Sequence, residues 1–138
     1  MEVDTGHWVV EIEMPEDAFG FIYEITSLVD GRKYIGKKQM TRRIKRQPLK
    51  GKKRKRICNV ESDWKKYTGS CEQLNEDIIT YSTDEFLFEI LKFCKNKYEL
   101  NYFEAKLQFE REVLLNDDYY NGQIRVRLGR PPKTFTGT

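Results

Sequence analysis

Two tyrosine-containing tripeptides are the first feature of the sequence that could do chemistry. The tripeptide FIY ends at Tyr23 and the tripeptide YIG begins at Tyr34, with ten residues between them. Taken alone, each tyrosine is explained as a half-buried packing residue, because its shape favours strands. Its hydroxyl has an ordinary pKa of about 10, so it is a poor base at neutral pH unless cations or a proton relay assist it.

A dense run of positive charge follows the second tripeptide. Residues 37–56, the basic arm, contain twelve of the 25 lysines and arginines and no acid, which leaves 13 bases against 22 acids elsewhere. Such a run is usually a solvated loop or a nonspecific anion patch. It can also neutralise many phosphates, and binding would then fall steeply as salt rises. Its basic residues are Lys37, Lys38, Arg42, Arg43, Lys45, Arg46, Lys50, Lys52, Lys53, Arg54, Lys55 and Arg56.

A glutamate and an asparagine complete the candidates. The segment 97–114 is expected to form a long helix, because apolar residues recur at spacings of three, four and seven: Leu100, Phe103, Leu107 and Leu114. Glu104 lies roughly 40° from Leu100, at the border of this stripe, so its carboxylate can point into a groove beside a sheet. Glu110 borders the other edge, so periodicity does not single out Glu104. Asn121 precedes a glycine and by itself indicates a turn.

The elements that must position these residues are a small antiparallel sheet and its flanking helices. Strands are predicted near 20–26, 32–37 and 86–93, and helices near 71–81 and 97–114. Asp-Gly between the first two strands is a hairpin signal. The two tripeptides are therefore expected on adjacent antiparallel strands, in an α/β (α+β) fold.

Two further segments are predicted outside this core. Residues 7–13 alternate weakly and indicate an extra N-terminal strand without an assigned partner. The basic arm is expected to be an exposed loop, because it combines high charge with Pro48 and Gly51, although residues 39–46 could form a short helix.

The length of 138 residues fits one domain. We expect an N-terminal extension at 1–18, the main domain at 19–125 and a mobile tail at 126–138. No apolar run is long enough for a membrane span and the N-terminus is acidic, so an intracellular protein without membrane contact is expected. Three widely separated cysteines indicate reduced thiols rather than a disulfide framework or a zinc site.

In combination these residues resemble the GIY-YIG nuclease family, whose name describes two such tripeptides on adjacent strands. The resemblance covers about residues 19–125, with Gly20 preceding FIY. Family members follow the tripeptides with a basic residue, then a glutamate on a later helix and an asparagine beyond it. The Arg42/Arg43 region, Glu104 and Asn121 stand at these places. The basic arm and the stretch ESDWKKYTGS are similar to those of small stand-alone phage-type members.

The resemblance implies a metal-dependent endonuclease and a role for each residue. Tyr23 would act as the general base or help to orient it, and Tyr34 would support the attacking water and the phosphate. One arginine would grip the scissile phosphate, because a guanidinium can donate two parallel hydrogen bonds to it. Glu104 would hold a single Mg²⁺ or Mn²⁺ ion. Asn121 would position the Glu104 helix or a water on the substrate side.

The sequence leaves two assignments open: the arginine that contacts the phosphate and the residue that replaces the family histidine. The usual position of the family arginine is occupied by Ile44. The histidine found in many members is missing, since the only histidine is His7, far upstream; Lys38 or Tyr67 could take its place. The rivals for the arginine are Arg43, Arg42 and Arg46.

DNA is the implied partner, most simply double-stranded, and a homodimer on the substrate is left open. The location implied is the cytoplasm, that of the host cell if the protein is phage-encoded. One alternative is a non-catalytic nucleic-acid-binding module with the same fold. Another is a partner of acidic proteins, which gives no reason for a glutamate beside a phosphate-binding groove. The residues expected to contact nucleic acid are Lys37, Arg46, Lys52, Lys53, Arg54, Lys55, Arg56, Trp64 and Tyr67.

Overall fold

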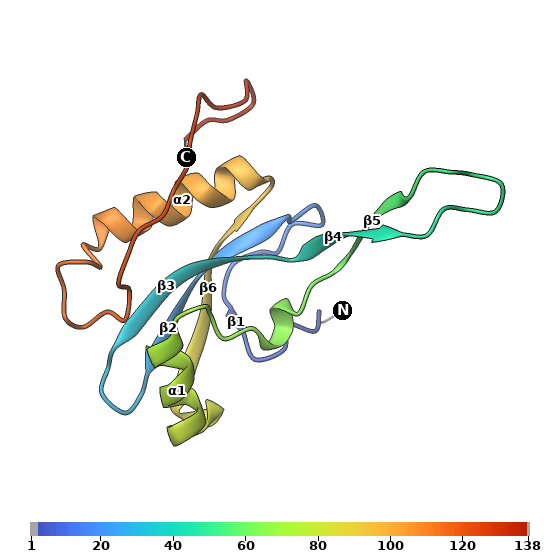
Figure 1. Ribbon diagram of the computed structural model, residues 1–138. Helices are drawn as coiled ribbons and strands as arrows, with labels where there is room; N and C mark the ends of the chain where they lie inside the picture. The colour runs from blue at the N-terminus through green and yellow to red at the C-terminus, as the bar shows by residue number, and fades with distance from the viewer. Residues whose placement is uncertain (1–2, 138) are drawn as a thin grey trace.

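The computed structural model describes residues 3–137 and places a sheet between two helices (Figure 1). The predicted mixed α/β class is confirmed. Residues 1, 2 and 138, at the ends of the predicted extension and tail, lie outside the described part. The strands are β1 (Val9–Val10), β2 (Gly20–Ser27), β3 (Lys33–Gln39), β4 (Thr41–Arg46), β5 (Arg56–Glu61) and β6 (Phe86–Cys94). The helices are α1 (Glu72–Tyr81) and α2 (Lys97–Glu110), with short 3₁₀ turns at Trp64–Lys66 (η1) and Thr83–Glu85 (η2).

The main sheet has the strand order β1-β6-β2-β3. β2 pairs antiparallel with both β3 and β6, and Tyr23 lies opposite Gly36, so the two tripeptides occupy adjacent antiparallel strands as predicted. The prediction of a three-stranded antiparallel sheet is incomplete in two respects. The N-terminal strand is only two residues long and joins the sheet as a fourth strand, parallel to β6. A separate two-stranded sheet is formed by β4 and β5.

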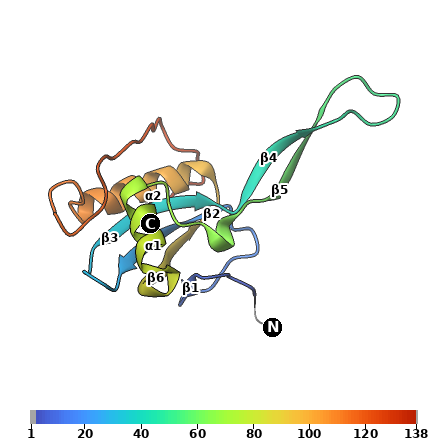
Figure 2. The ribbon, with the colours of Figure 1, turned by 60° about the horizontal axis from the view of Figure 1, so that its bottom comes forward.

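The central strand β2 divides the core into two layers. Its alternate side chains point to opposite faces, as the two-residue period of a strand requires. Phe21, Tyr23 and Ile25 pack with residues of α1 in one cluster, and Ile22 packs with residues of α2 in the other. Figures 1 and 2 show the two helices on opposite sides of the sheet. Nearly all of β2 is buried, including Glu24, whose carboxylate forms ion pairs with Lys33 and Arg111.

Helix α2 carries the candidate glutamate and ends earlier than predicted. Its N-cap is Asn96, whose side-chain oxygen accepts the backbone N–H of Glu99 at 2.9 Å. The prediction that it runs to residue 114 is wrong. The helix stops at Glu110 because the backbone turns to a left-handed conformation at Glu112, with φ 50°. Leu114, expected on the apolar stripe, is 47% exposed.

The basic arm contains most of a β-hairpin rather than a loop, and the short helix considered for residues 39–46 is wrong. β4 and β5 pair antiparallel from Thr41–Glu61 to Arg46–Arg56 and project away from the main sheet (Figures 1 and 2). In these strands half-buried residues are interspersed with exposed charged ones. At the tip, the N–H of Lys52 donates to the Leu49 carbonyl at 2.8 Å across a turn that contains Gly51 at φ 84°.

The chain after α2 returns to the edge of the sheet and then crosses α2. The N–H of Tyr120 donates to the Lys33 carbonyl at 2.7 Å, so this segment runs beside β3. In the segment predicted as a mobile tail, the Phe135 ring packs between Tyr98 and Tyr102, and the Tyr98 hydroxyl donates to the Gly129 carbonyl. Among residues 3–137, no helix has the length and apolar character needed to cross a membrane.

Candidate active site

Tyr23 lies at the centre of an aromatic cluster. Its side chain is 1% exposed, with its ring centroid 6.1 Å from those of both Tyr34 and Tyr67 and 5.0 Å from that of Trp8. Burial, reinforced by the neighbouring tyrosines and by Glu104, raises the pKa of Tyr23 well above its ordinary value. The hydroxyl is therefore neutral at physiological pH and acts by hydrogen bonding.

Two glycines leave room for the Tyr23 hydroxyl. A Cβ added to Gly36 would overlap this hydroxyl, which explains why the YIG tripeptide ends in glycine. A Cβ added to Gly69 would come within 3.2 Å of the same hydroxyl, and Gly69 also has φ 86°, a conformation that side chains disfavour. Neither glycine was selected as a site residue from the sequence. The only signal was their place in the short motifs YIG and YTGS.

Tyr34 is the more accessible of the two tyrosines. Its side chain is half-buried, and its hydroxyl lies 3.3 Å from that of Ser70 at the start of α1. Burial raises its pKa, and Glu104 adds to the shift, whereas the hydrogen bond with Ser70 lowers it. Tyr34 lines a hollow together with Ser70, Cys71 and Asn121. It can therefore contact a bound phosphate or water.

Glu104 brings α2 into this arrangement. Its side chain is 12% exposed, and the Lys37 ammonium lies 3.7 Å from its carboxylate. Burial raises the pKa of Glu104, and Lys37 only partly opposes the shift. The negative charge of Glu104 contributes to the raised pKa of both Tyr23 and Tyr34, so its carboxylate interacts electrostatically with both phenols. The ion pair with Lys37 joins α2 to β3, the strand that carries Tyr34.

The predicted substitutes for the missing histidine lie beside one another. The Lys38 ammonium forms an ion pair with Asp63 at 2.7 Å and lies 4.1 Å from the centre of the Tyr67 ring. His7 is distant in sequence but not in space: its Nε2 hydrogen-bonds the Tyr67 carbonyl at 2.9 Å, and its ring stacks on Phe88. Burial lowers the pKa of His7. Sequence spacing alone could not place it there.

Trp64, one of the residues expected to contact nucleic acid, is 4% exposed and packs against Phe21. Its indole N–H donates to the Glu61 carboxylate at 3.0 Å. The ring is part of the core, and it anchors the base of the β4–β5 hairpin.

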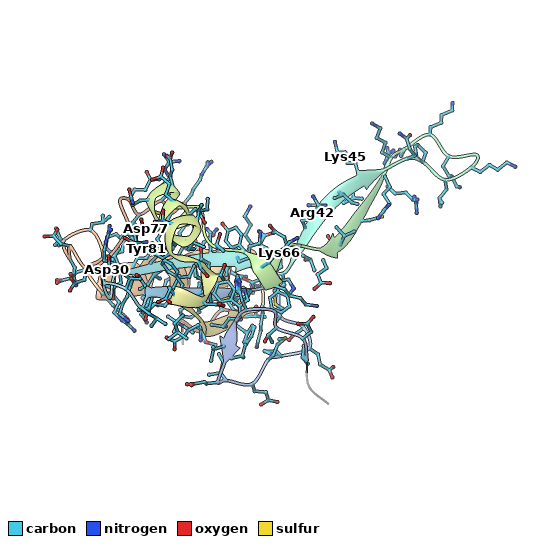
Figure 3. All side chains as sticks on the ribbon, turned by 90° about the horizontal axis from the view of Figure 1, so that it is seen from below. Asp30, Arg42, Lys45, Lys66, Asp77 and Tyr81 are labelled. Atoms are coloured by element: carbon cyan, nitrogen blue, oxygen red, sulfur yellow. The ribbon has the colours of Figure 1, made fainter. Side chains whose placement is uncertain are left out.

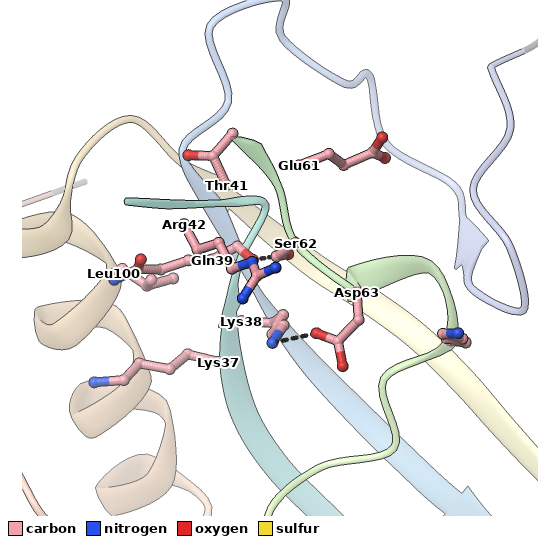
Figure 4. A pocket seen from close by; sticks show the side chains of 10 residues that line it. Lys37, Lys38, Gln39, Thr41, Arg42, Glu61, Ser62, Asp63 and Leu100 are labelled. Atoms are coloured by element: carbon pink, nitrogen blue, oxygen red, sulfur yellow. Dashed lines mark hydrogen bonds and ion pairs between the residues drawn. The ribbon is translucent and has the colours of Figure 1, made fainter. Parts of the chain in front are cut away.

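The three rival arginines are separated by the hairpin geometry. Arg42 lines a hollow with Lys37, Lys38 and Asp63, between β3, η1 and α2 (Figure 4). Arg43 has the next position on β4, so its side chain leaves the opposite face, and it lines a second hollow with Phe19, Lys97 and Arg42. Arg46 lies farther out, opposite Arg56. Of the three, Arg42 lines the hollow that contains Lys37, the lysine paired with Glu104.

The other residues expected to contact nucleic acid divide between two regions. Lys37 and Tyr67 lie beside the site, as described above. The rest are exposed near the outer end of the hairpin: Lys52, Lys53, Arg54, Lys55 and Arg56.

Asn121 contacts β3 rather than α2. Its side-chain oxygen accepts the N–H of Ile35 at 3.1 Å, and its nitrogen donates to the Ile35 carbonyl at 2.8 Å. Gln108 of α2 donates to the same carbonyl at 3.0 Å. These two amides fix the strand residue next to Tyr34. Gln108 was missed in the sequence, where a glutamine in a charged helix gives no signal of burial.

The donor set suits a metal held mainly by substrate and water. No group of three histidine, cysteine or acidic side chains in residues 3–137 is arranged to bind a metal ion. Mg²⁺ commonly binds one or two protein carboxylates and takes its other ligands from water and substrate phosphates. Glu104 fits this role, because it is a partly covered carboxylate whose pKa is raised by burial and only partly lowered by Lys37.

A comparison with protein families decides the family. Residues 7–124 match the family model described as "Putative endonuclease segE, GIY-YIG domain". The chain belongs to the GIY-YIG family of nucleases. The recognition from the two tripeptides is thereby confirmed, and the GIY-YIG match also takes in strand β1. No curated protein and no solved structure matched the chain.

Proposed function

We propose that this GIY-YIG protein is an endonuclease that hydrolyses phosphodiester bonds in double-stranded DNA and requires one Mg²⁺ or Mn²⁺ ion. The observation that supports this most directly is the Glu104 carboxylate, which is 12% exposed, lies 3.7 Å from the Lys37 ammonium and interacts electrostatically with both Tyr23 and Tyr34. A metal ligand, two polar hydroxyls and a cation then face one bound phosphate. Phosphodiester hydrolysis needs these groups where negative charge develops.

Glu104 would hold the metal. A divalent ion bound there supplies a Lewis acid for the phosphate and lowers the pKa of its bound water. The carboxylate must be deprotonated to bind the metal ion. Lys37 favours this state, because its positive charge counteracts the effect of burial on the pKa of Glu104.

The two tyrosines would have different tasks. Tyr34 is half-buried and lines an open hollow, so its hydroxyl can orient the attacking water. Tyr23 is buried and stays neutral, so its hydroxyl continues the hydrogen-bonded network through Tyr67 rather than removing a proton by itself. This division develops the expectation that Tyr23 is the base or lies near it.

Arg42 is the arginine we assign to the scissile phosphate. It lines the hollow that also contains Lys37 and Lys38 (Figure 4). A guanidinium there can donate two hydrogen bonds to phosphate oxygens. The ion pair with Asp63 would orient the Lys38 ammonium, and Lys38 would take the role of the missing family histidine.

Plasmid cleavage tests this function. Wild-type protein with Mg²⁺ should nick or linearise a supercoiled plasmid, and EDTA should stop the reaction. Glu104→Ala should reduce the rate at least about 10³-fold, because a bound metal contributes several kcal/mol to transition-state stabilisation. The matched control is Glu110→Ala, an exposed glutamate on the same helix, which should cleave like wild type.

The outcome also separates the two remaining interpretations. If the wild-type protein shifts DNA at low salt but cuts it with neither metal ion, the chain is a binding module with a nuclease fold. If Glu104→Ala cuts as fast as wild type, the metal site is elsewhere.

A further inference from the structure

The β4–β5 hairpin has no partner for most of its surface. Beyond its base at Trp64, it extends away from both helices (Figures 1 and 2). Figure 3 shows its side chains, among them Lys45, directed outward on both sides of the ribbon. From residue 41 to residue 61 it has ten lysines or arginines and one acid, Glu61, at its base. Packing within the fold therefore does not account for the composition of this ribbon.

The pairing register divides the hairpin into two faces. Opposed residues share a face, so Arg42–Val60, Ile44–Cys58 and Arg46–Arg56 form one, which we call the Arg46 face. Arg43–Asn59 and Lys45–Ile57 form the other, which we call the Asn59 face; the Thr41–Glu61 pair continues this face at the base of the hairpin. Both faces carry arginine. A ribbon lying flat on a phosphate backbone would need positive charge on one face only.

The two faces differ in burial. On the Arg46 face, Ile44, Cys58 and Val60 are half-buried. On the Asn59 face the four side chains beyond the Thr41–Glu61 pair are all exposed, and Ile57 is 58% exposed although it is apolar. An exposed isoleucine beside an arginine, a lysine and an asparagine has no structural purpose that the hairpin itself supplies.

The side chains of the Asn59 face match the chemistry of base edges. Arginine and lysine bind the O6 and N7 acceptors of guanine, asparagine pairs with adenine, and an apolar side chain contacts the thymine methyl group. The dimensions agree as well. A two-stranded ribbon fits the major groove of B-DNA, which is about 12 Å wide, whereas the minor groove is about 6 Å wide.

We propose that the β4–β5 hairpin enters the major groove of double-stranded DNA and that the Asn59 face contacts base edges there. The Arg46 face and the basic tip contact the phosphates of the groove walls. Cleavage then occurs at preferred sequences rather than at random. This inference rests on the proposed function in one respect, since it takes DNA as the substrate.

Binding without cleavage tests the proposal. Wild-type protein in EDTA is used to select from a library of duplexes with a random central region, and fluorescence anisotropy then measures affinity for the selected duplex, its single strand and the corresponding RNA duplex. The variants are Asn59→Ala and Ile57→Ala, with Arg46→Ala as control from the other face. All three residues are exposed, and circular dichroism verifies that each variant folds.

The expected result is a selected motif and a preference for duplex DNA, because the major groove of RNA is too narrow for side chains to read. Asn59→Ala should lower discrimination at one position about tenfold, whereas Arg46→Ala should weaken all sequences alike and reduce the salt slope by about one. The proposal is overturned if no motif is selected, if RNA or single strands bind equally well, or if Asn59→Ala and Arg46→Ala behave alike.

These outcomes are distinct from failure of the proposed function. If the protein selects a motif but never cuts a plasmid, the groove contact is supported and the nuclease function is contradicted. If it cuts plasmids but selects no motif, the nuclease function is supported and the groove contact is contradicted.

Discussion

The surroundings of Tyr23 and the β4–β5 hairpin are opposite kinds of structure in one small chain. Around Tyr23 the packing is so close that a single methyl group at Gly36 has no space. Along the hairpin, ten cations and an exposed isoleucine are held by strand pairing alone. The first arrangement fixes atoms and suits catalysis, while the second presents charge and suits binding. Substitutions should therefore separate rate from affinity.

The largest effect is expected from removing one hydroxyl in the packed region. Tyr34→Phe should lower kcat about 10²- to 10⁴-fold, the range for a group that assists proton transfer or orients water. DNA affinity in EDTA should not change, since the hairpin is intact. Single-turnover cleavage and anisotropy measure the two quantities. Tyr81→Phe, an exposed tyrosine of α1, is the control.

The same substitution at Tyr23 tests whether the hydroxyls of Tyr23 and Tyr34 have different roles in catalysis. Tyr23→Phe should also reduce kcat, but by a smaller factor than Tyr34→Phe, because the Tyr23 hydroxyl is buried and acts through its neighbours. A larger loss for Tyr23→Phe would show that the buried phenol contacts the reacting groups.

The next effect in size concerns the hairpin. Replacing the five basic residues at 52–56 with serine should reduce the slope of log affinity against log salt by up to about 4.5, because each phosphate contact contributes about 0.9. The rate at saturating protein should stay the same. The free energy of unfolding should change by no more than about 0.5 kcal/mol for each replaced residue, as is usual for exposed substitutions. An unchanged slope would mean that DNA is held elsewhere.

A smaller effect on stability is expected at Gly36. Gly36→Ala should lower the free energy of unfolding by about 1 to 3 kcal/mol, the usual cost of overpacking a core. Combining it with Tyr23→Phe removes the overlapping oxygen and should recover part of the loss. Urea denaturation of the two single variants and the double variant measures this coupling. Strict additivity would show that the contact is not the cause.

The smallest effect is a pH dependence at Glu104. Burial raises its pKa in the folded protein above the ordinary 4.5, so the folded state holds the proton more tightly than the unfolded state. Stability should therefore decline as pH rises from 4.5 through the raised pKa, and Glu104→Gln should abolish that decline. Mg²⁺ should stabilise the wild type above this range and leave Glu104→Gln unaffected. Denaturation midpoints across this range, with and without Mg²⁺, measure both effects.

The sequence predicts most of the main sheet and both helices, because their apolar residues recur with the period of a strand or a helix. It fails where local patterns are ambiguous. The hairpin was expected to be a loop, since charge and Pro48 conceal a strand whose apolar residues are few. The predicted end of α2 lies past Glu110, because periodicity does not reveal the left-handed turn at Glu112.

For the candidate site, the sequence supplies the residues but little of their surroundings. Family resemblance selects Tyr23, Tyr34 and Glu104, and in the structure the charge of Glu104 contributes to the raised pKa of both tyrosines. His7 and Gln108 were missed, because their places depend on contacts between segments far apart in the chain.

The two side-chain amides that donate to the Ile35 carbonyl determine when, during synthesis, strand β3 gains its last hydrogen bonds. β2 and β3 leave the ribosome early, but the side chains that anchor the free edge of β3 belong to residues 108 and 121. Until the second of these emerges, the strand beside Tyr34 lacks its lateral hydrogen bonds. A nascent chain therefore carries both tyrosines before the side chains that fix the strand beside them have emerged.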